Sequence, residues 1–269
     1  MHDGLFLVHL FIICYFLFQN LDKTDFLYYN IKVSSFYQKT EGEKRMKLVL
    51  AATIGYLIGG INPAYIIAKI RGFDIRKHGS GNAGASNAVI TMGKKVGIIS
   101  ALFDIIKAFL AVLLADKIFA TATAGSVAGA ACIIGHIFPI FMSFRGGKGL
   151  ACLGGVILAF DPIVFLILLA IEMVLVLLVD YICIVPITAS IIFPILYGFM
   201  TRDAIGTAMF SVASLVMLYK HIENLKRIRN GTEAHFSFLW KRNKEIERLQ
   251  VETYDPAEEE RKEKQGNAE

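Results

Sequence analysis

The chain has 269 residues, of which 55% are apolar, and its mean hydropathy is +0.55. Soluble domains are about 45–50% apolar, and here the excess is collected in long blocks, which argues against a soluble domain. The net charge is +5, and the basic residues gather in a few short segments. That placement is typical of loops that orient a membrane protein, not of a nucleic-acid-binding surface.

Residues 1–45 are predicted to be an N-terminal extension. Its apolar run, residues 4–18, is too short for a confident membrane crossing. A signal peptide or anchor is one interpretation, although the run lacks a basic start and a small-residue cleavage site. We favour a second interpretation, in which translation begins at Met46. Met46 opens an apolar run, and residues 40–45 are those that a purine-rich ribosome-binding site would encode.

Long apolar segments predict an all-α integral membrane protein with about seven transmembrane helices. A helix needs about 20 apolar residues to cross the hydrocarbon. The predicted crossings are residues 46–70, 96–115, 118–144, 150–160, 163–179, 181–200 and 204–219. The fourth is short, at about 16 Å for 1.5 Å per residue. We expect a polytopic domain over residues 46–236 and a charged cytoplasmic tail over residues 237–269.

The basic residues predict the orientation of this bundle. With seven crossings, the loop at residues 71–95, the loop at 143–149 and the tail from residue 220 share one face. That face holds Arg71, Arg76, Lys77, Lys94, Lys95, Arg145, Lys148, Lys220, Lys226, Arg227 and Arg229. The short loops of the other face hold only Lys117 and Arg202. The crowded face is therefore expected to be cytoplasmic.

Two ionisable residues lie inside a predicted crossing. Asp104 and Lys107 are three residues apart, so they share a helix face and can pair. Charged residues within a membrane are candidates for function, and a purely structural ion pair is an equally good interpretation. The cysteines, Cys14, Cys132, Cys152 and Cys183, form no C-x-x-C pair and predict neither a disulfide framework nor a metal site.

A bare polar stretch at residues 78–87 is the first candidate site. Gly79, Gly81 and Gly84 fit the dinucleotide pattern G-x-G-x-x-G, but that fingerprint needs a preceding β-strand, and here membrane segments flank it. The glycines still allow backbone N–H groups to approach an anion. Side chains of Ser80, Asn82 and Asn87 add neutral hydrogen-bonding groups. The alternative is a flexible turn between helices.

A second glycine-rich loop surrounds Lys148. Gly147 and Gly149 flank this lysine before an apolar segment, and the pattern differs from a Walker A loop because no Ser or Thr follows the lysine. A lysine among glycines at the start of a helix is suited to binding phosphate. The alternative is a charge that only sets the membrane orientation.

The third candidate site follows the last crossing. His221, Asn224 and Arg227 lie on one face if the segment is helical, with Gly231 and Glu233 after them. An imidazole, an amide and a guanidinium that point the same way suit a polar substrate with hydroxyl and phosphate groups. The alternative is a basic helix end at the membrane surface.

These motifs resemble the bacterial membrane acyl-phosphate:glycerol-3-phosphate acyltransferase family. The resemblance runs from Met46 to Phe236. It includes Asn62-Pro63, Asp74-Ile-Arg-Lys77, Gly79-Ser-Gly-Asn82, Gly93-Lys-Lys95, Gly135-His-Ile-Phe-Pro139, Gly146-Gly-Lys-Gly149 and the segment 221–233, in the family's order. It implies a multi-pass bacterial cell membrane protein with its site facing the cytoplasm. It also implies acyl transfer from acyl phosphate to the 1-hydroxyl of glycerol 3-phosphate, giving lysophosphatidate and phosphate without a cofactor.

The resemblance also implies roles for the candidate residues. Ser80, Asn82 and Lys148 would hold phosphate, His221 and Asn224 would place glycerol phosphate, and Arg227 and Glu233 would shape the third motif. The substrate-binding backbone would come from Gly79, Gly81, Gly84, Asn87, Gly147 and Gly149. The expected partners are the two substrates and membrane lipid, with no nucleic acid and no metal. No residue would form an acyl-enzyme, because acyl phosphate is already activated.

The chain departs from the family's pattern at several positions. Ile90 stands where the family usually has Arg, and Asp180 and Cys183 stand where it usually has a basic residue and Ser. Ser86 and Cys152 each replace Thr, and the tail after Phe236 is longer. A lost guanidinium and a new carboxylate should weaken phosphate binding, which is the mark of a divergent paralogue. The alternatives are therefore a non-catalytic relative that binds acyl phosphate or phospholipid, and a transporter with a phosphate-lined cavity.

Overall fold

The computed structural model describes the backbone of residues 23–250 and, from Thr40 on, their side chains except those of Ala122 and Arg242. Every regular element in this range is a helix. The α-helices are α2 (Lys23–Gly59), α3 (Pro63–Ile70), α4 (Ala85–Met92), α5 (Lys94–Phe119), α6 (Ala122–Ile137), α7 (Leu150–Phe160), α8 (Pro162–Val179), α9 (Ile184–Thr201), α10 (Ala204–Arg229) and α11 (Phe238–Leu249), with 3₁₀ turns η1 (Ile75–Lys77) and η2 (Ile140–Met142). The chain divides into two compact units between Lys47 and Leu48.

The predicted N-terminal extension is only partly described. Residues 1–22 lie outside the described residues, and so does Cys14. α2 begins at Lys23 and continues through Met46, so the start of translation at Met46 stays a prediction.

The all-α membrane class is confirmed by the helices of the described part. Six segments are long and apolar enough to span a bilayer: Thr40–Ile70, Lys94–Phe119, Thr123–Met142, Pro162–Val179, Ile184–Thr201 and Ala204–Arg229. The seventh predicted crossing is α7, which has only 11 residues. The count of seven crossings therefore remains a prediction.

Residue size is distributed as in a membrane bundle. Ala68, Ala108 and Ala128 are fully buried between helices, whereas Leu178 and Phe199 are 79% and 73% exposed. Lipid tails solvate large apolar side chains, so small residues are selected where helix backbones must approach each other. This pattern explains why so much of the apolar content lies on the outside.

Glycines set the contact between α2 and α6. A Cβ at Gly55 would lie 2.1 Å from the carbonyl oxygen of Ala128, and one at Gly59 would lie 2.1 Å from that of Cys132. From the other side, a Cβ at Gly135 would lie 2.1 Å from the carbonyl oxygen of Tyr56. Gly55 and Gly59 thus form a small-residue face on which α6 packs.

A buried ion pair secures the end of α2. Lys107 Nζ lies 2.6 Å from Asp104 Oδ1, and it donates to the carbonyl oxygens of Gly59 at 2.9 Å and Ile61 at 2.6 Å. The carbonyl of Gly59 has no helical partner because Pro63 has no N–H to donate. That of Ile61 has none because Tyr65 N–H, four residues on, donates to Asn62 Oδ1. The predicted pairing of Asp104 with Lys107 is confirmed, and the ammonium also caps a broken helix.

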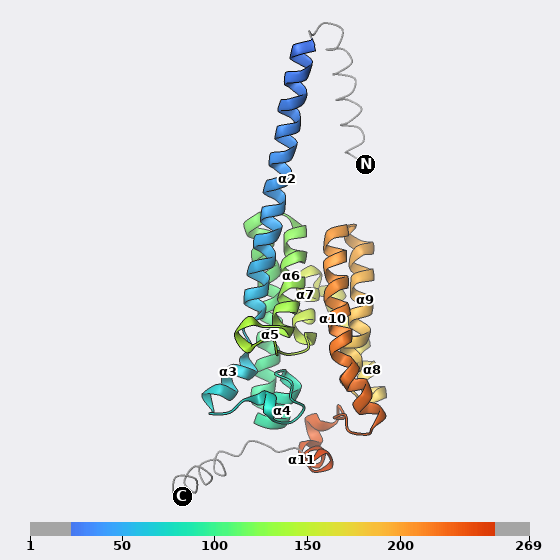
Figure 1. Ribbon diagram of the computed structural model, residues 1–269. Helices are drawn as coiled ribbons and strands as arrows, with labels where there is room; N and C mark the ends of the chain where they lie inside the picture. The colour runs from blue at the N-terminus through green and yellow to red at the C-terminus, as the bar shows by residue number, and fades with distance from the viewer. Residues whose placement is uncertain (1–22, 251–269) are drawn as a thin grey trace, which may run out of the picture. The chain divides into compact units, whose positions relative to one another are not determined.

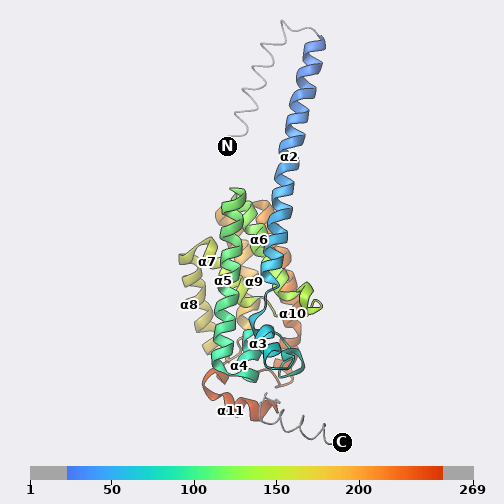
Figure 2. The same ribbon diagram turned by 90° about the vertical axis from the view of Figure 1, so that its left-hand side faces the viewer.

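Two segments differ from the sequence prediction. Residues 71–95, predicted as a loop, contain the eight-residue helix α4. The predicted tail, residues 237–269, begins with α11, whose Phe238 is 1% exposed and packs against Val89 and Ile90 of α4. An apolar face packed on α4 makes this segment part of the fold. Figures 1 and 2 show α3, α4 and α11 at the same end of the bundle.

Gly135→Ala should destabilise the bundle, because the new methyl group would force α2 and α6 apart. Overpacking of this kind costs about 1–3 kcal/mol, and thermal unfolding of the detergent-solubilised protein would measure it. Gly154→Ala is the matched control, since its Cβ would meet only Phe165 at 3.6 Å. Equal melting temperatures for the two variants would contradict the close contact of α2 with α6.

Candidate functional site

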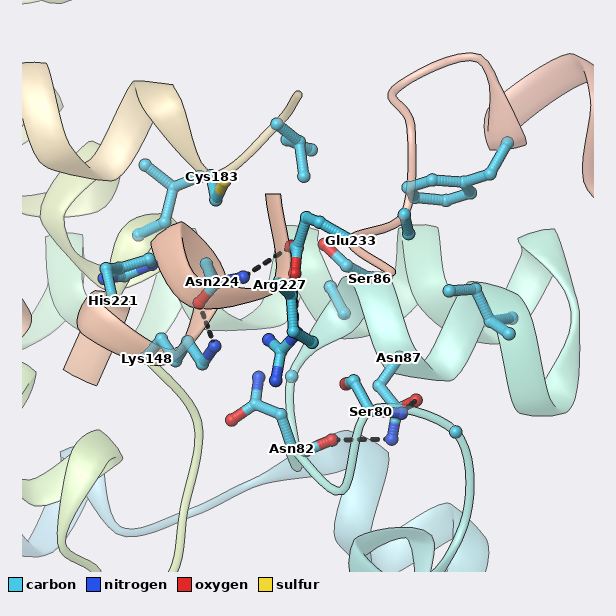
Figure 3. A pocket seen from close by; sticks show the side chains of 18 of the residues that line it. Ser80, Asn82, Ser86, Asn87, Lys148, Cys183, His221, Asn224, Arg227 and Glu233 are labelled. Atoms are coloured by element: carbon cyan, nitrogen blue, oxygen red, sulfur yellow. Dashed lines mark hydrogen bonds and ion pairs between the residues drawn. The ribbon is translucent and has the colours of Figure 1, made fainter. Parts of the chain in front are cut away.

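A cavity of about 530 Å³ lies where the two glycine loops meet the end of α10. Of the predicted site residues, those that line it are Gly79, Ser80, Asn82, Gly84, Asn87, Lys148, Gly149, His221, Asn224, Arg227 and Glu233. Gly81 and Gly147 do not line it. Three motifs that are far apart in sequence therefore surround one space, as Figure 3 shows.

Asn87 organises the first glycine loop from the first turn of α4. Its Nδ2 donates to the carbonyl oxygens of Asn82 at 2.8 Å, His78 at 3.0 Å and Ile75 at 3.2 Å, and its Oδ1 accepts from Ser80 N–H at 3.0 Å. These bonds use its side-chain amide, which is 1% exposed, and they position Ser80 and Asn82. The role of Asn87 as a substrate ligand stays a prediction.

Glycine is required where this loop passes Asn87. Gly79 has φ +57°, and a Cβ there would lie 2.2 Å from Asn87 Oδ1. Gly81 has φ +70° and shapes the turn without reaching the cavity. Its positive φ gives Gly81 a conformational role, and its contact with substrate stays a prediction.

The second glycine loop folds back on the end of α6. The N–H groups of Gly146 and Gly147 donate to the carbonyl oxygens of Ile137 and His136, at 3.1 and 3.0 Å. A Cβ at Gly147 would lie 2.0 Å from His136 Nε2. Gly147 therefore lets the loop pass the imidazole, and its contact with substrate stays a prediction.

Two helix N-termini face the cavity. α4 starts after Gly84 and α7 starts after Gly149, and neither glycine can cap the helix with a side chain. Both glycines line the cavity together with the first residues of their helices. The N–H groups of a first helical turn have no partner within the helix and carry partial positive charge. The cavity is thus built to hold anions at two places.

The third motif links Lys148 to α10 through a chain of hydrogen bonds. Lys148 Nζ donates to Asn224 Oδ1, and Asn224 Nδ2 donates to Glu233 Oε1 at 2.5 Å. The other oxygen of Glu233 accepts from Arg227 Nε at 2.6 Å. Figure 3 shows Lys148 and Arg227 pointing into the space next to Asn82. Glu233 orients both an amide and a guanidinium, so cationic and neutral donors converge on the cavity.

Burial tunes the charge of Lys148. Burial and, to a smaller extent, Arg227 lower the pKa of Lys148 to about 8, and Glu233 opposes this shift. The neighbouring Cys183 is neutral, because burial raises the pKa of its thiol to about 11. The ammonium is therefore a strong, poorly solvated ligand for an anion below pH 8 and is lost above it.

His221 has a fixed tautomer. Its Nδ1 lies 2.7 Å from the carbonyl oxygen of Met217, one turn earlier in α10. A carbonyl only accepts hydrogen bonds, so Nδ1 carries the proton in the neutral ring and Nε2 offers a lone pair. His221 lines the cavity, where this lone pair can accept a hydrogen bond from a hydroxyl group.

A buried cluster behind the cavity resembles a metal site in composition. Asp104, His136 and Cys152 each offer one possible ligand atom, and these three atoms lie within 4.8 Å of one another. The Lys107 ammonium, however, lies 2.6 Å from Asp104 Oδ1 and 3.1 Å from His136 Nδ1. A cation therefore already neutralises this carboxylate. Asp104 and His136 also line the cavity, which the sequence did not predict for either residue.

The unusual positions Ile90 and Asp180 contact the C-terminal segment. Ile90 lines the cavity and packs with Phe238. The expectation that Asp180 brings a carboxylate to the phosphate site is wrong. Its Oδ1 accepts from Ser237 N–H at 3.0 Å, its carbonyl oxygen accepts from Phe236 N–H at 2.7 Å, and it does not line the cavity.

Arg76 joins the two glycine loops. Its Nη1 donates to the carbonyl oxygen of Met142 at 2.7 Å, and its Nη2 lies 2.7 Å from Asp74 Oδ2. The hydrogen bond from Arg76 lowers the pKa of Asp74 to about 2. This arginine, predicted only as an orienting charge, holds the first loop against η2.

Comparison with known proteins gives a consistent result. The family model described as glycerol-3-phosphate acyltransferase matches residues 49–231. A glycerol-3-phosphate acyltransferase of Thermoanaerobacter sp. (strain X514) is 40% identical over 191 residues, which are 70% of this chain and 96% of that protein. One of Bacillus subtilis (strain 168) is 34% identical over 195 residues, which are 72% and 100% of the two chains.

Solved structures agree with these relatives. The glycerol 3-phosphate form of PlsY (YgiH), an integral membrane glycerol 3-phosphate acyltransferase, is 33% identical, with a TM-score of 0.66 over 71% of this chain and 96% of that one. Its lysophosphatidic acid form gives a TM-score of 0.62 at 32% identity, over 70% and 94% of the two chains. The region that the family model matches ends at residue 231, before α11.

Anion binding should weaken as the pH rises through about 8, because Lys148 then loses its proton. Isothermal titration of the detergent-solubilised protein with sulfate, whose charge is constant over this range, would measure the effect. An expected loss of about tenfold in affinity between pH 7 and pH 9.5 corresponds to about 1.4 kcal/mol. Lys148→Met should bind sulfate weakly at both pH values. If this variant showed the same pH-dependent loss of affinity, the titrating group would not be Lys148.

Proposed function

This chain belongs to the glycerol-3-phosphate acyltransferase family, and we propose that it transfers a fatty acyl group from acyl phosphate to the 1-hydroxyl of glycerol 3-phosphate. The products are lysophosphatidate, for phospholipid synthesis, and inorganic phosphate. The observation that carries this proposal is the presence of two uncapped helix N-termini, those of α4 and α7, on one cavity. Each substrate of such a reaction brings one phosphate group.

The lining residues divide between these two anions. Ser80, Asn82 and Lys148 hold phosphate beside the N-termini of α4 and α7, where N–H groups and an ammonium are concentrated. His221 and Asn224 place glycerol 3-phosphate from α10, while Glu233 keeps Arg227 directed at the cavity through its 2.6 Å contact. Gly79, Gly84 and Gly149 leave backbone space for both ligands.

The chemistry needs little beyond this positioning. The 1-hydroxyl oxygen attacks the carbonyl carbon of acyl phosphate, a new C–O ester bond forms, and the bond from that carbon to the phosphate oxygen breaks. The phosphate leaves with the bonding electrons. His221 Nε2 accepts the hydrogen bond of the attacking hydroxyl, and the released phosphate takes the proton. Charge builds up where Lys148 and the helix N-termini stabilise it.

The reaction takes place at the membrane surface. Leu150, Ile182 and Pro186 give the cavity an apolar side next to the bundle, where the acyl chain of the donor and product can stay in lipid. The cavity faces the cytoplasm, because the loops around it carry most of the basic residues of the predicted cytoplasmic face. The site uses no cofactor or metal.

Purified protein in lipid should form lysophosphatidate from acyl phosphate and labelled glycerol 3-phosphate, and Lys148→Ala should reduce turnover by about 10²-fold or more. The expected loss follows from removing the cation nearest the leaving phosphate. Arg202→Ala is the control for loss of a basic residue at a distant loop, and it should keep full activity.

Three outcomes separate the alternatives. Turnover with acyl-CoA but not with acyl phosphate would exclude the proposed donor. Binding of acyl phosphate without any lysophosphatidate above the Lys148→Ala background would favour the non-catalytic relative. Ester formation at the 2-hydroxyl, read from the product by NMR, would exclude the proposed position.

A further inference from the structure

The C-terminal helix α11 covers one side of the cavity. It lies beyond residues 49–231, the range that the family model matches. Phe238 at its start is 1% exposed and packs with Val89 and Ile90, while Phe238 and Arg248 both line the cavity. This helix therefore joins the wall of the site from outside the family's shared region.

The start of α11 is fixed by the turn that ends α8. The carbonyl oxygen of Asp180 accepts from Phe236 N–H at 2.7 Å, and its Oδ1 accepts from Ser237 N–H at 3.0 Å. His235 stacks on Tyr181 of the same turn, with ring centroids 5.1 Å apart. The segment that links α10 to α11 is thus held at residues 235–237 by the turn after α8.

The far end of α11 returns to the same link through Arg248. Its Nη1 donates to the carbonyl oxygen of Gly231 at 2.7 Å, and its Nη2 donates to that of Glu233 at 2.6 Å. Glu245 holds the guanidinium, because its Oε1 accepts a hydrogen bond from Arg248 Nη2 at 2.5 Å. The same oxygen also accepts from His235 N–H at 2.8 Å. One side-chain pair therefore fixes the backbone at Gly231, Glu233 and His235.

Glu233 transmits this constraint to the substrate site. Its backbone is bonded to Arg248, and its carboxylate bonds Asn224 Nδ2 at 2.5 Å and Arg227 Nε at 2.6 Å. Because Asn224 turns its amide nitrogen to Glu233, its Oδ1 faces Lys148. A displaced Glu233 would release the amide and the guanidinium together.

We infer that α11 is a brace for the glycerol 3-phosphate half of the site and that Arg248 is a positioning residue acting through Glu233. This inference rests on the proposed function for the identity of the substrate. Of the five N–H groups of Arg248, four are used by Glu245 and by backbone carbonyls, so we assign it to positioning and not to phosphate binding. Its role is to keep the groups that touch substrate in place.

Arg248→Ala should raise the KM for glycerol 3-phosphate about tenfold and leave the KM for acyl phosphate unchanged. A purely structural role would instead reduce the amount of active protein and lower kcat at constant KM. Lys244→Ala, which removes an exposed positive charge from the same helix, is the matched control and should match the wild type. Arg248→Lys should give a partial defect, because an ammonium cannot reproduce the planar fork.

A double substitution tests the route through Glu233. Glu233→Ala should raise the same KM by itself, and adding Arg248→Ala should then change it by less than about twofold. Independent, multiplying effects of the two substitutions would overturn the inference, since Arg248 would then act on substrate by another route.

Amide hydrogen exchange gives a readout that does not need turnover. Exchange at residues 231–237 should be faster in Arg248→Ala than in the wild type and unchanged in Lys244→Ala. Unchanged exchange in Arg248→Ala would overturn the brace even if the enzyme were active. An inactive wild type with faster exchange in Arg248→Ala would instead refute the proposed function and leave the brace standing.

Discussion

The site depends on a positive charge buried inside the bundle. Lys107 lies at the point where α2 breaks, and it holds the freed carbonyls of Gly59 and Ile61 while pairing with Asp104. One residue further on, Asn62 donates to the carbonyl of Ala83 at 2.8 Å and so fixes the first glycine loop. His136 also contacts Lys107, and Gly147 of the second glycine loop packs directly on its imidazole ring. Both glycine loops therefore contact residues that one buried ion pair holds in place, and loss of this pair would leave several buried polar groups unpaired.

Much of the fold could be predicted because the bilayer imposes it. Long apolar segments must be helices, since no water satisfies their backbone groups, and the pairing of Asp104 with Lys107 followed from their helical spacing. The third motif was also predictable, because His221, Asn224 and Arg227 lie on one face of any helix through them. The motifs around Gly79 and Lys148 indicated anion binding from their composition, and the structure brings them to one cavity.

What could not be predicted depends on contacts between distant segments. Asn87 was assigned to substrate because its residue type suits a ligand, and its bonds to loop carbonyls are contacts that no local pattern shows. Asp180 was expected to act on the phosphate site, yet a left-handed turn at φ +59° directs it to Ser237. The charged composition of residues 237–250 indicated a solvated tail, although Phe238 and Glu245 are buried. Ile90 and Asp180, two positions where the resemblance implied other residues, both contact the segment at the start of α11.

The capping of α2 by Lys107 also bears on how the bundle is made. The carbonyls at residues 59 and 61 precede the ammonium in the chain, so a ribosome delivers the acceptors before the donor. When α5 leaves the translocon, its lysine meets a neutralising carboxylate on its own helix and a ready set of acceptors on a helix that is already inserted. The order of synthesis thus spares a charged segment from waiting alone in lipid, where an unpaired ammonium is costly.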